Sequence, residues 1–167
     1  AEGFAQIRRA QACGINFIDT AEMYPVPPKA GTYGATEQII GNWFAQRGDR
    51  TDWVLASKVA GPGNSISHIR DGQPKLDRKN IVAALDGSLK RLQTDWIDLY
   101  QLHWPERSTN FFGQLGYTHN ADEDFTPLED TLEALDEQVR AGKIRHIGLS
   151  NETPWATMKF LQLAESR

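Results

Sequence analysis

The 167-residue sequence is poor in several residue types and patterns, and each shortage excludes a class of protein. It has one cysteine, Cys13, so it forms no intrachain disulfide, and we expect a reducing, cytoplasmic location. No run approaches the roughly 18 consecutive apolar residues that span a bilayer, and no signal peptide opens the chain, so we expect no membrane association. With 18 basic against 22 acidic residues, no basic stripe is present to neutralise phosphates, and nucleic acid is not an expected partner.

Two kinds of binding motif are also missing. No Gly-x-Gly-x-x-Gly follows a strand-like segment, which argues against a doubly wound dinucleotide-binding fold, and Gly61-Pro62-Gly63 is interpreted as a turn. The four histidines show neither the His-x-His nor the Glu-x-x-His pairing of metal sites, so we expect no bound metal.

What is present is ordinary globular composition, with 40% hydrophobic and 24% charged residues, in a chain long enough for one domain or part of a larger one. The apolar residues alternate between two spacings along the chain. Helical spacing predicts helices over 2–13, 35–47, 77–92, 127–141 and from 154 onward. Short apolar runs predict strands over 15–18, 53–57, 96–102 and 144–149.

Three helices carry signals at their first turn or on one face. Asp77 is placed to cap the third helix. Thr126 and Glu129 are spaced as a capping box for the fourth, with Pro127 at the first helical position. In the last helix, the spacing of the apolar residues predicts that these side chains face inward: Trp155, Met158 and Leu161.

Strands that alternate with helices form a parallel sheet, and both a doubly wound sheet and a (β/α) barrel have this order. The connections favour the barrel. Helix-to-strand links are minimal, whereas the strand-to-helix loops 19–34, 58–77 and 103–126 are long. Long structureless loops are usually functional or disordered, and their confinement to one end of the sheet places the site at that end. The sequence therefore predicts an α/β fold of four parallel strands and about five helices.

Polar residues follow all four expected strands. Asp19, Lys58 and His103 come after the first three strands, and Ser150 and Asn151 come after the fourth. Each alone has an ordinary explanation, as a turn former, a solvated lysine or a structural histidine. In a parallel sheet, however, groups that follow the strands meet at the carboxyl ends of the strands. The presence of four such sets of polar groups at this one end, called the mouth below, indicates a site.

Tyr24 lies in the loop that begins at Asp19 and completes a group with clear chemistry. The unperturbed pKa of a phenol is near 10, too high for ready proton transfer at neutral pH, and we expect the Lys58 ammonium to lower it. Asp19 would hold the lysine charged, and a neutral His103 would donate a hydrogen bond to a carbonyl oxygen. Such a group suits protonation of a carbonyl oxygen during reduction. The hydride must come from a nicotinamide or a flavin, because no side chain donates one.

Four stretches carry a resemblance to a known family: GINFIDTAEMYPVP (14–27), ASKVAGP (56–62), DRKNIVAALDGSLKRLQTDWIDLYQLHWP (77–105) and GKIRHIGLSNET (142–153). Through them the chain resembles the aldo-keto reductases, most closely their Tas-like bacterial branch. The resemblance runs over all 167 residues, and its motifs are specific because they fall on four strands at consistent intervals.

The resemblance implies a (β/α)8 barrel that reduces aldehydes and ketones with NADPH. It implies a proton donor at Tyr24, supported by Lys58 and Asp19, and a residue that orients the carbonyl at His103. Hydrogen bonds to the nicotinamide carboxamide are implied for Ser150 and Asn151, and the cofactor-binding set that we expect is Ser150, Asn151 and Asp19.

The substrate is expected to be a small carbonyl compound in an aromatic-walled pocket. The third long loop supplies the aromatic residues for it: Trp104, Phe111, Phe112 and Tyr117.

The family barrel takes about 250 residues and eight strands, and this chain supplies four of those strands. We therefore expect residues 1–167 to be part of a single barrel, from the helix after the first strand to the helix after the fifth. The part that grips the cofactor phosphates would be missing. Such a fragment would expose unpaired strand edges, so we expect it to self-associate or to be only partly folded.

Three alternatives to a working reductase stay open. The chain could be an inactive truncated fragment, or a regulatory barrel that binds a nicotinamide cofactor without turning it over. It could also be a metal-dependent hydrolase or lyase, in which His68, His119 and His146 join His103 at one mouth.

Overall fold

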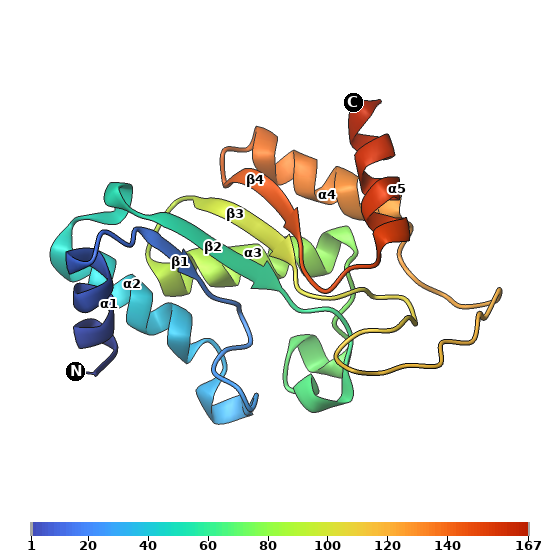
Figure 1. Cartoon of the computed structure of the whole chain (residues 1–167), viewed down its shortest axis with the longest axis horizontal. Helices are drawn as coiled ribbons and strands as arrows, with labels where there is room; N and C mark the ends of the chain where they lie inside the picture. The colour runs from blue at the N-terminus through green and yellow to red at the C-terminus, as the bar shows by residue number, and fades with distance from the viewer. Residues whose placement is uncertain (1, 167) are drawn as a thin grey trace.

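Four parallel strands lie at the centre of the structure, a computed structural model that describes residues 2–166 (Figure 1). Neighbours in the sheet follow chain order, β1-β2-β3-β4. The strands are β1 (Phe17–Asp19), β2 (Val54–Val59), β3 (Ile97–Leu102) and β4 (Ile144–Leu149). The α-helices are α1 (Glu2–Ala12), α2 (Ala35–Arg47), α3 (Arg78–Leu92), α4 (Leu128–Arg140) and α5 (Pro154–Glu165). For the described residues, the α/β class with four parallel strands and five helices is confirmed.

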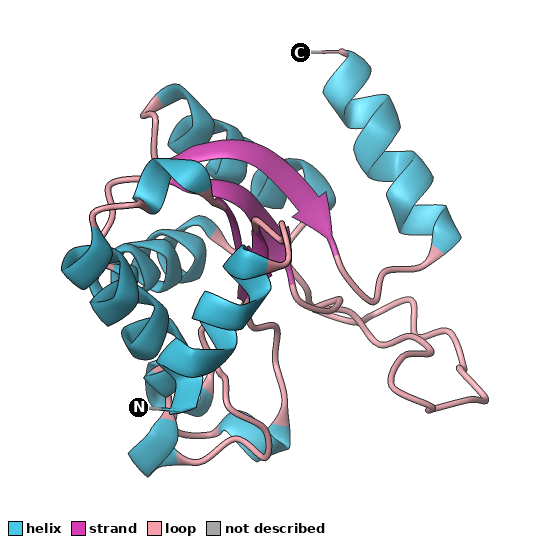
Figure 2. Cartoon of the chain, turned by 60° about the vertical axis from the view of Figure 1, so that its left-hand side comes forward, coloured by secondary structure: helices cyan, strands magenta, loops and turns pink. Residues whose placement is uncertain are grey.

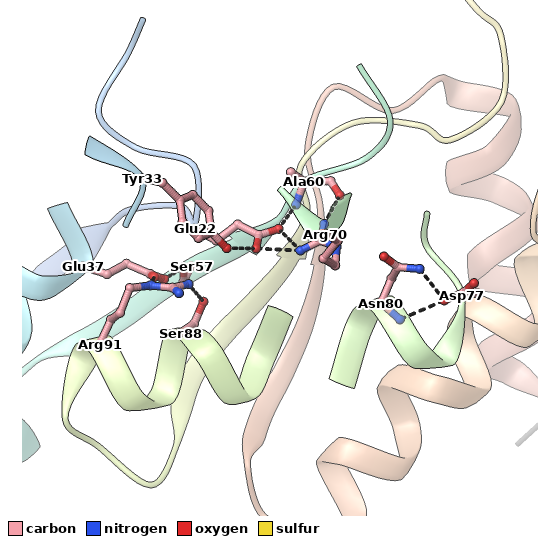
Figure 3. Close-up of polar contacts among 10 residues, drawn as sticks. All are labelled: Glu22, Tyr33, Glu37, Ser57, Ala60, Arg70, Asp77, Asn80, Ser88 and Arg91. Carbon is pink, nitrogen blue, oxygen red and sulfur yellow. Dashed lines mark hydrogen bonds and ion pairs between the residues drawn. The ribbon is translucent and has the colours of Figure 1, made fainter. Parts of the chain in front are cut away.

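Local capping signals set several of the helix ends. Asp77 caps α3, because its Oδ1 accepts a hydrogen bond from the backbone amide of Asn80 at 2.8 Å (Figure 3). At the end of α2, Gly48 has a φ of 69°, which glycine adopts readily, and its N–H donates to the carbonyl of Phe44. These ends lie where the sequence predicted them.

The capping box predicted for α4 is wrong. The helix begins at Leu128, and Thr126 does not bond to its first turn. The amide and hydroxyl of Thr126 instead donate to Oε1 of Glu106, at 3.0 and 3.1 Å. The Glu106 carboxylate competes successfully for these donors, and it also accepts the backbone amide of Leu76. Glu106 therefore ties the 58–77 loop to the 103–126 loop.

Two strands are displaced from their predicted positions. β1 begins at Phe17 and includes Asp19, which pairs with Ala56 of β2. β2 runs on through Lys58, which pairs with Gln101 of β3. Asp19 and Lys58 therefore lie inside their strands and not after them, so the pairing of the strands fixes their backbones.

The two faces of the sheet have different neighbours. α3 packs on β2, α4 packs on β4, and α2 packs against α3, so that in Figure 2 helices crowd one side of the strands. Leu55 and Tyr100 point into the apolar core under these helices. Because side chains alternate along a strand, Lys58 and Gln101 point to the opposite face.

The inward face predicted for α5 is also wrong. Three apolar side chains of this helix are exposed, at 57%, 56% and 54%: Trp155, Met158 and Leu161. The buried residues are Ala156 and Phe160, which lie on the side of α5 that packs against α4. α5 has apolar residues on more than one face, so the spacing of apolar residues alone did not identify the face that packs against α4.

Across residues 2–166, none of the helices is both long and apolar enough to cross a membrane.

Candidate active site

An ion pair between β1 and β2 is the centre of the candidate site. The Nζ atom of Lys58 lies 2.7 Å from Oδ2 of Asp19 and also donates to the carbonyl of Thr20 at 2.9 Å. The lysine side chain is 6% exposed and the aspartate side chain is 49% exposed. The ammonium is therefore held in place by two oxygens while its partner faces the mouth of the sheet.

Gln101 holds the other oxygen of the same carboxylate, and the sequence analysis missed it. Its Nε2 donates to Oδ1 of Asp19 at 3.0 Å. The available signal was the strand alternation, which places Gln101 on the same face as Lys58, its partner in the register. Asp19 thus accepts hydrogen bonds from side chains of both β2 and β3.

Tyr24 and His103 join this pair at the carboxyl ends of the strands. The Lys58 ammonium lies 5.3 Å from the centroid of the Tyr24 ring. The Tyr24 and His103 rings are 5.6 Å apart in an edge-to-face arrangement. Among residues 2–166, no group is hydrogen-bonded to the Tyr24 hydroxyl. The structure therefore brings the four predicted catalytic side chains together and leaves the phenol group available.

The pKa of the Tyr24 phenol shifts in the direction opposite to our expectation. Burial raises it above its ordinary value, and the negative charge of Asp19 raises it further. The expectation that this pKa is lowered is therefore wrong, because burial and the aspartate charge both raise it. As a consequence, Tyr24 carries its proton throughout the neutral range.

His103 is a buried, neutral imidazole. Its side chain lies almost entirely out of solvent, and burial together with the Lys58 charge lowers its pKa to about 4, against a small opposing effect of Asp19. Within the described part of the chain, its Nδ1 is buried and has no hydrogen-bond partner. The ring is therefore uncharged near pH 7.

Ser150 and Asn151 lie beside His103 in the turn after β4. The amide of Asn151 donates to the His103 carbonyl at 2.8 Å and to the Ser150 hydroxyl oxygen at 3.0 Å. Asn151 has a φ of 55°, a left-handed conformation in which asparagine is enriched. Among the described residues, no donor reaches its Oδ1. The turn thus presents an amide oxygen and a hydroxyl close to the other site residues.

Three of the four aromatic residues predicted for the pocket are in contact. The ring of Trp104 lies 4.6 Å from that of His103 and 5.6 Å from that of Phe112, and Phe112 contacts Phe111 at 5.2 Å. Tyr117 pairs instead with a histidine of its own loop. It nevertheless lines, with Phe111, a hollow of about 400 Å³ in the 103–126 loop.

A buried ion pair connects that loop to the turn after β4. Arg107 donates to both carboxylate oxygens of Glu152, at 3.1 and 2.5 Å, and to the hydroxyl of Thr153 at 3.0 Å. The arginine side chain is 10% exposed and the glutamate side chain is 6% exposed. The pair fixes the loop against the segment that carries Ser150 and Asn151.

The other histidines do not assemble around His103. His68 packs edge-to-face against Tyr33, His119 contacts Tyr117, and His146 is exposed on β4. Residues 2–166 hold no cluster of three or more histidine, cysteine, aspartate or glutamate side chains suited to a metal ion. The metal-dependent alternative thus gains no support.

A fully buried glutamate near Tyr24 was also missed. Glu22 is 0% exposed and forms an ion pair with Arg70 at 2.7 Å (Figure 3). No sequence signal separates such a residue from an ordinary loop carboxylate, because its partner lies in a different loop.

Comparison with known proteins gives consistent matches. A model of the Aldo/keto reductase family matches residues 1–166. Protein tas of Escherichia coli is 55% identical over 166 residues, which are 99% of this chain and 48% of that protein. A Schizosaccharomyces pombe protein, aldo-keto reductase yakc, whose name includes NADP(+), is 37% identical over 87% of this chain and 35% of its own length. The chain thus matches about half the length of the bacterial relative and about a third of the length of the yeast relative.

A solved structure matches as well. It is a thermostable aldo-keto reductase in complex with the inhibitor epalrestat, 32% identical, with a TM-score of 0.67 over 96% of this chain and 45% of that chain. This match confirms the expected fold, part of a (β/α)8 barrel.

Proposed function

Because the chain belongs to the aldo/keto reductase family, we propose that it is part of an enzyme that reduces aldehydes or ketones to alcohols with hydride from NADPH. We further propose that residues 1–167 form part of a single (β/α)8 barrel, since the relatives extend well beyond the matched segment. One observation carries the proposal: Asp19, Lys58, Tyr24 and His103 converge at the carboxyl ends of the strands.

Tyr24 acts as the proton donor. Its raised pKa keeps the phenol protonated near neutral pH, so the proton is present when it is needed. As negative charge builds on the carbonyl oxygen during reduction, the phenol proton passes to that oxygen. Lys58, whose ammonium lies 5.3 Å from the ring centroid, stabilises the phenolate that is left.

Asp19 orients Lys58. Its carboxylate accepts from the ammonium at 2.7 Å and from Gln101 at 3.0 Å, so it cannot rotate without losing a hydrogen bond. The lysine charge is therefore held beside the Tyr24 ring while the carboxylate balances it.

His103 orients the substrate carbonyl. A neutral imidazole has one N–H, and burial of Nδ1 without a partner favours the tautomer that carries the proton on Nε2. That N–H donates to the carbonyl oxygen beside the Tyr24 hydroxyl. With two donors at one oxygen, charge that develops there is stabilised.

The cofactor site fits a nicotinamide in the part that this chain supplies. The Asn151 Oδ1 and the Ser150 hydroxyl supply an acceptor and a donor for the carboxamide, and Asp19 lies at the same mouth. NADPH, when bound, supplies the hydride. The NADP(+) in the name of the yeast relative supports the choice of NADPH.

The substrate is a small carbonyl compound that packs against aromatic side chains. Trp104 and Phe112 extend the aromatic surface outward from His103, and Phe111 continues it.

The cellular compartment that we propose is the cytoplasm. The single, exposed cysteine fits a reducing, cytoplasmic compartment.

A cofactor-binding regulatory barrel is the second candidate, and substitution of Tyr24 separates the two. In the complete barrel protein, we expect Tyr24→Phe to bind NADPH as the unaltered protein does and to lose reduction of a nitro-substituted benzaldehyde. If the unaltered protein binds NADPH but reduces none of a broad set of aldehydes and ketones, the regulatory function replaces the reductase function that we propose.

A further inference from the structure

The Glu22 carboxylate is buried with a full set of donors. Its Oε1 accepts from the Ala60 amide at 2.7 Å and from Nη1 of Arg70 at 2.9 Å. Its Oε2 accepts from the same Nη1 at 2.7 Å and from the Tyr33 hydroxyl at 2.9 Å (Figure 3). A buried charge is unfavourable unless it is paired and hydrogen-bonded in this way.

These bonds join the loop after β1 to two parts of the loop after β2, just beyond the ion pair of the site. Glu22 belongs to the loop after β1, Ala60 directly follows β2, and Arg70 begins a short 3-10 helix, Arg70–Gly72, later in the same loop. The Glu22 amide also donates to the Lys58 carbonyl at 3.2 Å, and Arg70 Nη2 donates to the Ala60 carbonyl at 2.9 Å. Tyr24 is two residues beyond Glu22, so these bonds set the distance between its backbone and that of Lys58.

The backbone around Arg70 is strained. Arg70 has a φ of 45° and Asp71 has a φ of 58°, both in the left-handed region that residues other than glycine rarely occupy. Such conformations persist only where the surroundings enforce them, and they cluster at functional sites. The bonds of the Arg70 side chain to Glu22 and Ala60 are the restraint at this position.

We propose that Glu22 is a positioning residue for proton transfer, which holds the Tyr24 loop against the end of β2 so that the phenol stays aligned with Lys58. This inference rests on the proposed function, since it takes Tyr24 as the proton donor. Glu22 touches neither substrate nor cofactor and acts through the backbone that it restrains.

The test uses Glu22→Gln in the complete barrel protein. Glutamine has nearly the same volume, but one of its two terminal atoms is a donor and would face a donor of Ala60, Arg70 or Tyr33.

Glu37→Gln is the matched control. Glu37 belongs to α2, is also 0% exposed, and accepts from Arg91 at 2.7 Å and from Ser57 at 2.6 Å (Figure 3). Its arginine packs over the Tyr33 ring at 4.9 Å, but its carboxylate forms no hydrogen bond with the loop that carries Tyr24. Both variants lose one buried charge with an arginine and a hydroxyl as partners, so their effects on folding are comparable.

Three quantities are measured for each variant: kcat and KM with NADPH and a nitro-substituted benzaldehyde, the solvent deuterium isotope effect on kcat, and the fluorine NMR signal of fluorotyrosine placed at Tyr24. Misalignment of a reacting group by about 1 Å can lower a rate by roughly 10²-fold, so we expect Glu22→Gln to lose about 10- to 100-fold in kcat. The KM for NADPH should change little, the isotope effect should rise, and the fluorine signal should broaden or split. Glu37→Gln should resemble the unaltered protein in all three.

Tyr33→Phe decides the question if Glu22→Gln does not fold, because it removes one donor and keeps the ion pair. We expect it to change kcat, the isotope effect and the fluorine signal in the same direction, by a smaller factor. A folded Glu22→Gln, or in its absence a folded Tyr33→Phe, that matches Glu37→Gln in all three measurements overturns the inference. The proposed function fails separately, if Tyr24→Phe retains its turnover.

Discussion

The ammonium of Lys58 lies 2.7 Å from the carboxylate of Asp19, although 39 positions separate the two residues in the chain. The parallel pairing of β1 and β2 brings them together, because Asp19 is in register with Ala56, two residues before Lys58. The contact is therefore set by two strands and not by a flexible loop. The side chains of the site can be substituted one at a time, and each substitution has a distinct expected effect.

Tyr24→Phe should remove the proton donor and keep the packing of the ring. A positioned general acid contributes about 10²–10⁴-fold, so kcat for carbonyl reduction in the complete barrel should fall by at least about 10²-fold. Steady-state oxidation of NADPH measures the rate, and fluorescence titration measures cofactor binding, which should change little. Tyr100→Phe is the control, since Tyr100 is buried and its hydroxyl has no partner among residues 2–166. Retention of most of the kcat by Tyr24→Phe would contradict the assignment.

Lys58→Met should lower kcat for a different reason. It removes the cation that stabilises the phenolate and leaves the Asp19 charge uncompensated, so the pKa of Tyr24 should rise further. We expect a loss of at least about 10-fold in kcat and a shift of the alkaline limb of the pH–rate profile to higher pH. The exposed lysine of the last turn of α3, changed as Lys90→Met, should leave both unchanged. An unaltered pH–rate profile in Lys58→Met would show that Lys58 does not affect the pKa of Tyr24.

His103 should make the folded protein less stable in mild acid. Its pKa is about 4 in the folded state and about 6.5 in an unfolded chain, so between these values only the unfolded chain binds the proton. Stability is therefore unaffected above pH 6.5 and falls as the pH decreases from 6.5 to 4, by up to about 3 kcal/mol. Urea unfolding of the complete barrel at several pH values measures this.

The control for that experiment is His103→Gln, which cannot titrate. The difference in the free energy of unfolding between the two proteins should narrow or reverse as the pH decreases, because only the unaltered protein loses stability through His103. Parallel stability curves from pH 7 to pH 4.5 would show that the imidazole is not held neutral.

The 167-residue chain on its own should self-associate or be only partly folded, and it should not turn over NADPH. Phe17 on β1 is 49% exposed, and Trp155 and Met158 on α5 are 57% and 56% exposed. Burying such a side chain is worth about 1.5–3 kcal/mol, against a typical domain stability of about 5–15 kcal/mol, so these surfaces favour association. Size-exclusion chromatography with light scattering and an NADPH oxidation assay test both parts.

A charged variant of α5, Met158→Glu with Leu161→Lys, should reduce that association if the exposed face of the helix mediates it. A monodisperse monomer that oxidises NADPH in the presence of an aldehyde would show that the rest of the barrel is dispensable.

The sequence predicted the order of the elements because the information is local. The α2 limits, the Asp77 cap and the β4 limits come from spacing and cap residues within one segment. The predicted capping box at Thr126 failed because its real partner, Glu106, is 20 residues away in another loop. The face of α5 failed because its packing partner, α4, had to be known first.

The same division holds for the candidate site. Asp19, Lys58 and His103 were found because parallel strands place their ends together, whatever the loops do. Gln101 was missed because strand alternation shows that it shares a face with Lys58 only when the register of β2 and β3 is known. The pKa of Tyr24 was predicted in the wrong direction, since the degree of burial is a property of the folded loop.

The Arg107–Glu152 pair has a consequence for the exchange of segments between relatives. Enzyme engineers alter specificity by grafting a loop from one barrel onto another, treating it as an independent module. Here the guanidinium of the 103–126 loop is bound through both of its terminal nitrogens to a carboxylate next to Asn151. A grafted loop without that arginine would leave a buried acid unmatched. The transferable unit is therefore the loop together with residues 150–153, and the two should be exchanged as one piece.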